Sequence, residues 1–452
     1  MIDTCVKAVK AAERHGADAA EAFVQRRRET EIGAEKGAVK NASTTTSSGL
    51  GLRVVKDHRL GFAYTTDLED VSEVAERAVE FSKLGKEIKG FEFASRAVTA
   101  TPIGYDERLA YLTPEQGLEQ LGAMLDAAVD YRKDANVAFA GVIGGLRESW
   151  LVNSGGLEVA DRGTYGVAGA WCILKDGEET ANGESSWYTR RWDVDGAALG
   201  REAAEWAVKS LKARALEKPP REVLFHPLAL REMFEFIVCP ALYGEQAHKG
   251  ESVYTDRLGQ PVAARGLTLV DNPLDESGYH AGPVDDEGQI AERVTLIEDG
   301  VLKAFLYDSV AAAEYGQRST ASAHRAERLS PERTFRAPPT IAARNLTAKF
   351  SSKPLDALLR ETESGLWVHS VLGAHTANPA SGDFAVNAAR SFVIENGEVA
   401  YPVKSAMVSG NFPKMLEQCT GAASDARAMR GAIACVGVTL PTMRFGGASI
   451  SA

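Results

Sequence analysis

The sequence has little cysteine and no long apolar run. Its 5 cysteines are spread over 452 residues without a CxxC pair. This pattern excludes a disulfide framework and a zinc ribbon, and we expect most of these cysteines to be small buried side chains. No run approaches the roughly 20 apolar residues of a membrane span. The first residues carry Lys and Glu where a signal peptide needs an apolar stretch, so we expect a cytoplasmic protein without membrane contact.

Positive charge is also scarce. Lys and Arg number 51 against 62 Asp and Glu, which gives a net charge of −11. Binding to a phosphate backbone needs clustered Lys and Arg, so nucleic acid is not an expected partner. The chain contains no GxxxxGKS or GxxxxGKT loop for phosphates and no GxSxG elbow for a nucleophilic serine. These absences exclude the commonest nucleotide-binding and acyl-transfer signatures.

The remaining composition is that of a globular protein with 44% hydrophobic residues, long enough for two or three domains. Lys218-Pro219-Pro220-Arg221 is the predicted boundary, because two prolines end a helix and cannot enter a central strand. Residues 1–217 alternate helical and strand patterns, whereas residues 222–452 are mostly strands with Asp-Gly and Asn-Gly turns. We predict an α+β protein with an N-terminal α/β-layered domain and a strand-rich C-terminal domain.

The stretch GAHTANPASGDF, Gly373 to Phe384, collects polar side chains without a large aliphatic anchor. His375 suits a base or an oxyanion donor, Asp383 suits its orienting partner, and Asn378 and Ser381 suit hydrogen-bonding walls. The alternative is a loop that bonds to itself, in which Asn-Pro and Ser-Gly-Asp only form turns. Both interpretations stay open from the residues alone.

Other polar clusters compete for a functional role. Glu245 and His248 have i,i+3 spacing on a possible helix, and His280 precedes the acidic run 285–287. Such residues are potential zinc ligands. Two carboxylates of the run Asp285-Asp286-Glu287 could instead form a proton-transfer pair. Solvent-exposed polar turns explain both patterns as well. The polar, poorly periodic segment 311–336 is predicted to be a loop over a cleft.

Longer motifs resemble a known family. SVLGAHTANPASGDFAVNAARSFVIENGEVAYPVKSAMVSGNF, from Ser370 to Phe412, resembles the C-terminal signature of the TldD/PmbA family, also called the modulator of DNA gyrase family, in its PmbA or TldE branch. GLGLRVV, ALYGEQAHKGESVYTDRLGQPVA and DDEGQIAERVTLIEDGVLKAFLYDS agree in the same order. The resemblance implies a C-terminal domain with a large curved antiparallel sheet or barrel. It also implies a dimer, commonly a TldD–TldE heterodimer that acts as a zinc metallopeptidase on unfolded or short peptides.

The resemblance also locates the family's zinc motif. The TldD branch carries an HExxxH helix, with a cysteine near the C-terminus as a further ligand. That helix falls here on EFIVCP, where Glu235 and Pro240 occupy the histidine positions and Phe236 replaces the glutamate. We therefore expect no metal or other cofactor on this chain and a zinc on a TldD-type partner. Cys435, near the place of the cysteine ligand, is interpreted as a buried structural residue.

The leading hypothesis is a non-zinc subunit that completes the substrate channel of a TldD-type peptidase. It is then a component of an enzyme, with the metal on its partner. Binding of peptide or partner is predicted for His375, Asn378, Ser381, Asp383 and Asn411, with support roles in catalysis for His375 and Asp383. One alternative is a homodimer that binds peptides, or hydrolyses them with Glu245, His248 and His280. Another is a specialised subunit that tailors a peptide-derived natural product.

Overall fold

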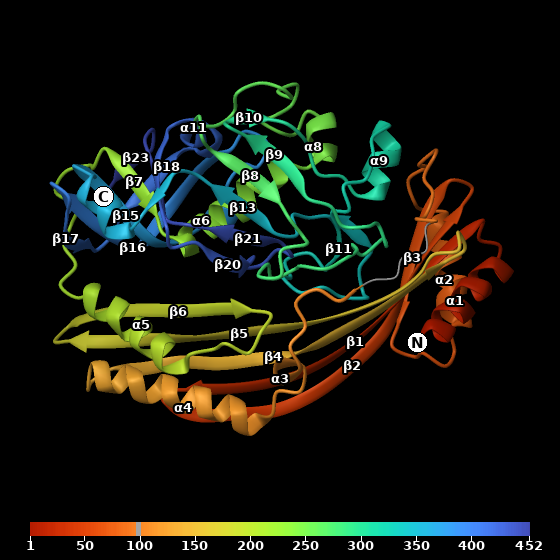
Figure 1. Ribbon diagram of the computed structural model, residues 1–452, viewed down its shortest axis with the longest axis horizontal. Helices are drawn as coiled ribbons and strands as arrows, with labels where there is room; N and C mark the ends of the chain where they lie inside the picture. The colour runs from red at the N-terminus through yellow and green to blue at the C-terminus, as the bar shows by residue number, and fades with distance from the viewer. Residues whose placement is uncertain (96–100) are drawn as a thin grey trace.

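The computed structural model describes residues 1–95 and 101–452, and its N-terminal part is built on one long, curved sheet (Figure 1). Six strands pair antiparallel in the order β3-β2-β1-β4-β5-β6. Their bounds are β1 Ala19–Glu35, β2 Ala38–Lys56, β3 Arg59–Thr65, β4 Asn136–Asn153, β5 Glu158–Asp176 and β6 Glu179–Thr189. Strands as long as β1 and β2, with 17 and 19 residues, accumulate the natural strand twist, which accounts for the curvature.

Helices cover the two ends of this sheet. They are α1 Ile2–Arg14 and α2 Ser72–Ser82 at one end, and α4 Pro114–Tyr131 and α5 Gly196–Lys209 at the other, with the short α3 Glu107–Ala110 before α4. The predicted start of α4 is confirmed. The Gln116 N–H donates to the Thr113 hydroxyl, and the Thr113 N–H donates to the Gln116 side chain, which forms a capping box.

Alternation along β1 assigns the two faces of the N-terminal sheet. Ala20, Ala22 and Val24 lie in the core beneath α1 and α2. Phe23 faces the other way and packs with residues of the C-terminal domain, and Glu21 on the same side bonds Arg325. The sheet is therefore a layer between its helices and the C-terminal domain, as Figure 1 shows.

The C-terminal domain contains a nine-stranded sheet, a six-stranded sheet and a two-stranded ladder. Its strands are β7 Glu222–Phe225, β8 Thr268–Asp271, β9 Val294–Glu298, β10 Val301–Leu302, β11 Ala323–Arg325, β12 Pro339–Ile341, β13 Leu346–Lys349, β14 Ser352–Lys353, β15 Ser364–Leu372, β16 Asp383–Glu395, β17 Glu398–Val403, β18 Met407–Asn411, β19 Cys419–Ala423, β20 Arg427–Arg430, β21 Gly437–Leu440, β22 Met443–Phe445 and β23 Ser449–Ser451. Its helical segments are α6 Pro227–Met233, η1 Phe234–Val238, α7 Cys239–Ala241, α8 Gly244–His248, α9 Ser309–Tyr315, α10 Leu355–Arg360, η2 Ala374–Thr376 and α11 Phe412–Glu417. The largest apolar core encloses α6, η1 and α7.

The predicted α+β class is confirmed, with an N-terminal α/β-layered domain, a strand-rich C-terminal domain and a curled sheet. The C-terminal sheets are mixed rather than wholly antiparallel. The pairs β7–β15, β14–β19 and β13–β21 are parallel, since long connections rather than hairpins join these strands. The predicted boundary falls between α5 and β7. Within residues 1–95 and 101–452, no helix has the length and apolar character needed to cross a membrane.

Candidate functional site

The helix predicted to carry the family's zinc motif, called here the motif helix, lies in the C-terminal core and has an unusual shape. It begins as α6, widens into the π-helical turn η1 and ends with α7. In the wide turn, the Cys239 N–H donates to the carbonyl of Phe234, five residues earlier. Pro240 has no N–H and would crowd the preceding turn of a regular helix, so the π-helical turn accommodates it. The motif substitutions therefore coincide with a change in the backbone.

Glu235, predicted to occupy the first histidine position of the motif, holds the C-terminal loop. Its carboxylate accepts hydrogen bonds from the backbone N–H groups of Ala432, Ile433 and Ala434 at 2.7, 2.8 and 2.6 Å. The residue is only 2% exposed. A buried carboxylate is costly without such partners, and here the three donors satisfy it. Glu235 thus anchors the loop that leads to Cys435.

The motif helix does not fit a zinc ion. Zinc takes nitrogen, sulfur or oxygen ligands, typically three from the protein in a catalytic site. The Phe236 ring and the Pro240 ring carry no donor atom, and the Glu235 carboxylate is committed to the loop. No rotamer change supplies the missing ligands. The chemistry of this chain therefore does not run through a metal on this helix.

A cavity of about 670 Å³ lies beside the motif helix. Its lining includes Phe236, Pro240, His324, Leu329, His375 and Cys435. The His375 ring lies edge-on to Phe236, with the ring centroids 6.2 Å apart. The cavity thus joins the motif helix, the polar loop and the C-terminal loop in one concave surface.

The predicted loop 311–336 is only partly a loop. Its first residues belong to α9, and β11 occupies residues 323–325. Residues 326–330 do line the cavity. The predicted position over a cleft is therefore correct for the middle of the segment, while the helix and the strand were not anticipated.

The structure does not bring His375 and Asp383 together. The Asp383 carboxylate accepts from Asn411 Nδ2 at 2.8 Å and from Ser381 Oγ at 2.7 Å, and these bonds lower its pKa. Asn378 Oδ1 accepts from two following backbone N–H groups. Within the described chain no hydrogen bond joins His375 to Asp383. The loop bonds to itself, as the alternative interpretation proposed, and His375 lines the cavity.

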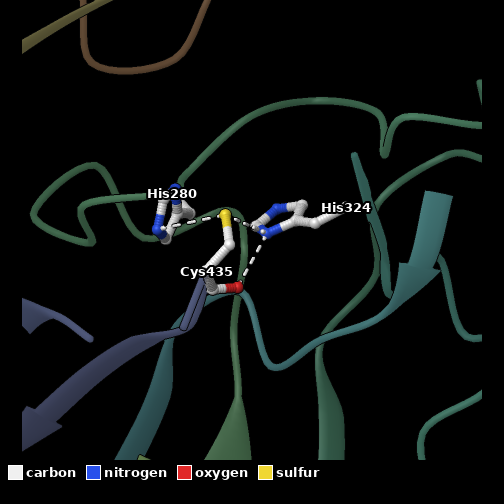
Figure 2. Close-up of side chains that lie close together, drawn as sticks. All are labelled: His280, His324 and Cys435. Atoms are coloured by element: carbon white, nitrogen blue, oxygen red, sulfur yellow. Dashed lines mark hydrogen bonds between the residues drawn. The ribbon is translucent and has the colours of Figure 1, made fainter. Parts of the chain in front are cut away.

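Three side chains from distant segments lie close together (Figure 2), and two of them, His324 and Cys435, line this cavity. Cys435 Sγ lies 3.9 Å from His280 Nε2 and 3.6 Å from His324 Nδ1. All three residues are buried, and one donor atom from each lies within 4.8 Å of the others. His280 and His324 precede Cys435 by 155 and 111 residues. No short spacing signals this cluster, so sequence reasoning did not connect its members.

Burial keeps these three side chains uncharged. It raises the pKa of Cys435 to about 12, lowers the pKa of His324 to about 3 and lowers the pKa of His280 well below its ordinary value. A nucleophilic cysteine paired with histidine needs the opposite shifts, toward thiolate and imidazolium. The cluster is therefore not a catalytic cysteine–histidine pair.

The predicted acidic run 285–287 holds β11 in place. Asp285 and Asp286 accept from the backbone N–H groups on either side of His324, at 3.1 and 2.7 Å. Burial raises the pKa of Asp286, but the Arg333 guanidinium outweighs it and holds that pKa below its ordinary value. The run thus positions His324 and supplies no ligand of its own to the cluster.

The alternative set Glu245, His248 and His280 does not form a site. Glu245 pairs with Lys249 at 2.5 Å, and the His248 ring stacks on Tyr315 with centroids 4.4 Å apart. Neither residue belongs to the cluster of His280, His324 and Cys435. In the described part of the chain, this cluster is the one group of three or more potential ligands that are close enough together to hold a metal ion. The hydrolase based on these three residues has no common centre.

Sequence models of three metallopeptidase domains match the chain. PmbA/TldA metallopeptidase domain 1 matches residues 20–82, the central domain matches residues 107–211, and the C-terminal domain matches residues 220–452. The chain belongs to the PmbA/TldD metallopeptidase family. This membership agrees with the resemblance drawn from the motifs between Ser370 and Phe412.

Individual relatives span nearly the whole chain. An uncharacterised protein of Methanocaldococcus jannaschii is 29% identical over 413 residues, 91% of this chain and 93% of the relative. Metalloprotease PmbA of Escherichia coli O157:H7 is 24% identical over 452 residues, with 95% and 92% covered. The crystal structure of TldE from Thermococcus kodakarensis aligns with a TM-score of 0.90 at 24% identity, over 99% of this chain and 100% of that one. This structural likeness establishes the fold.

Proposed function

We propose that this chain is the TldE-type subunit, without a zinc on its motif helix, of a two-subunit metallopeptidase that cleaves unfolded or short peptides. The observation that carries the proposal is the Glu235 anchor, because the first ligand position of the motif helix binds a loop in place of a metal. Family membership supports peptide-bond hydrolysis as the reaction. The absence of donor atoms at Phe236 and Pro240 supports a hydrolytic zinc on a TldD-type partner.

In this reaction the chain shapes and lines the path of the peptide. The Phe236 and Pro240 rings give the cavity wall an apolar surface, and His375 adds a polar group beside them. The loop residues Asn378, Ser381, Asp383 and Asn411 form the rim that contacts extended peptide or the partner. Pairing with the backbone of a substrate does not depend on its side chains, so we expect a broad range of peptides to be accepted.

A TldD-type chain suits the complex better than a second copy of this chain. A homodimer would contain two motif helices of the same composition, and neither would carry a histidine at the motif positions. The partner would supply the zinc and the water-polarising glutamate of its HExxxH helix. The residues of this chain would then bind and orient the peptide.

Peptidase assays on the separate and combined subunits test this proposal. We expect cleavage of an unfolded peptide by the co-expressed pair and none by this chain alone. Replacement of the HExxxH glutamate of the partner by glutamine should abolish the activity of the pair, because the water loses its base. Cleavage by this chain alone, or by a pair that carries the glutamine variant, would contradict the proposal.

A further inference from the structure

We propose that His280, His324 and Cys435 bind one zinc ion at a site distinct from the motif helix, with the fourth coordination position open to the cavity. Imidazole nitrogen and thiolate sulfur are both zinc ligands, and catalytic sites commonly use three of them. The site is independent of the hydrolytic zinc expected on a partner subunit. The inference therefore stands whether or not the chain works with such a partner.

The spacing of the donor atoms matches a four-coordinate zinc. Zn–S bonds of about 2.3 Å and Zn–N bonds of about 2.0–2.1 Å at tetrahedral angles place sulfur and nitrogen about 3.6 Å apart. Cys435 Sγ lies 3.6 Å from His324 Nδ1 and 3.9 Å from His280 Nε2. In Figure 2 both rings turn these nitrogens toward the sulfur. The three donor atoms lie within 4.8 Å of one another, so a movement of His280 toward His324 would complete three bonds to one ion.

Hydrogen bonding does not account for this arrangement. Among the described residues, His280 Nδ1 and His324 Nε2 are buried without a hydrogen-bond partner. The contacts on the facing nitrogens are long, including 3.4 Å from His324 Nδ1 to the Cys435 carbonyl. A metal ion would use the lone pair that each ring turns toward Cys435, on His280 Nε2 and His324 Nδ1. It would not contact His280 Nδ1 or His324 Nε2, the other nitrogen of each ring.

Two of the three ligands are held by their surroundings. The Asp285 and Asp286 side chains fix the backbone on both sides of His324. Glu235 anchors the loop that ends at Cys435. Such outer contacts orient metal ligands before the ion binds.

Nearby positive charges are compensated in part. Four guanidinium groups bear on the cluster, those of Arg333, Arg147, Arg190 and Arg344. Arg333 pairs with Asp286, and Arg147 lies 3.4 Å from a Glu332 oxygen. These two carboxylates offset part of the repulsion that the guanidinium groups exert on a cation, while the positive charges favour the thiolate of Cys435.

The ion has an entry path. His324 and Cys435 line the cavity of about 670 Å³, and His280 contacts Cys435. A zinc ion bound there keeps one position for water or for a donor atom of a molecule in the cavity, the arrangement of sites that bind exchangeable ligands. The cavity therefore connects the proposed ion to the surface that also contains His375.

Cobalt titration of the full-length chain, purified alone and freed of metal, tests the site. We expect one equivalent of Co²⁺ to produce a thiolate-to-cobalt absorption band that Zn²⁺ then removes. Cys435→Ser should lose the band. His280→Ala and His324→Ala should weaken Co²⁺ binding by more than about tenfold, the lower limit for loss of even an outer contact.

Matched variants show whether the cobalt band comes from this site or from other cysteines and histidines. Cys419 is 6% exposed, as is Cys435, so Cys419→Ser should keep the band. His375→Ala, which alters the same cavity outside the cluster, should keep it too. Absence of a saturable band in the wild-type chain, or its persistence in Cys435→Ser, would overturn the inference. Neither result bears on the two-subunit peptidase, which is assayed by peptide cleavage.

Discussion

At the scale of single residues, one buried carboxylate joins two distant segments of the C-terminal domain. Glu235, the residue predicted at the first histidine position of the motif, ties the π-helical turn to residues 432–434. A zinc bound by a motif helix and a C-terminal cysteine would join the same two segments. The three hydrogen bonds of Glu235 preserve that connection without an ion.

Replacement of Glu235 by glutamine should weaken this connection. The glutamine amide nitrogen is a donor and faces a backbone N–H, so at least one buried hydrogen bond is lost, at a cost of about 1–3 kcal/mol in the free energy of unfolding. Urea denaturation of the purified chain measures the change. Glu119→Gln, at an exposed position of α4, is the control, expected within about 0.5 kcal/mol of wild type. Equal stability of the Glu235 variant and wild type would show that the anchor contributes nothing.

At the scale of elements, local patterns in the sequence predict much of the structure. The Thr113-Pro114 signal gives the start of α4, and the Asp-Gly and Asn-Gly turns give β9–β10 and β16–β17, because these signals depend on neighbouring residues alone. The His280 cluster depends on contacts across more than a hundred residues. The parallel strand pairs of the C-terminal domain also join segments that are far apart in the sequence. No local pattern encodes either feature.

The polar loop is an element whose role a pair of variants can test. We expect His375→Ala to raise the KM of the two-subunit peptidase for an unfolded peptide, because a cavity-lining polar group is removed. Asp383→Ala should also lower turnover, since Ser381 and Asn411 lose their shared acceptor. Asp356→Ala removes an exposed carboxylate paired with Arg360 and is the control. Unchanged kinetics in both loop variants would exclude a substrate or partner contact.

At the scale of the whole molecule, a buried chain of charges joins the two domains. Arg53 on β2 lies 2.6 Å from Glu287 and 3.0 Å from Glu21, and Arg325 lies 2.6 Å from Glu21. Glu21 and Arg53 belong to the N-terminal sheet, whereas Glu287 and Arg325 belong to the C-terminal domain. All four are nearly inaccessible to solvent. The acidic run that positions His324 is thus tied to the N-terminal sheet as well.

Removal of one member of this buried chain should destabilise the whole molecule. Arg53→Ala leaves Glu21 and Glu287 short of a partner in the interior, and we expect a loss of about 3–5 kcal/mol in the free energy of unfolding.

Arg191 and Glu276 form another ion pair between the domains, but both side chains are about 60% exposed. Arg191→Ala is therefore the matched control, expected to cost about 0–1 kcal/mol because solvent screens the pair. Denaturant unfolding followed by tryptophan fluorescence compares the two variants. A similar small loss in both would mean that the buried charges do not hold the domains together and that apolar contacts such as those of Phe23 do so instead.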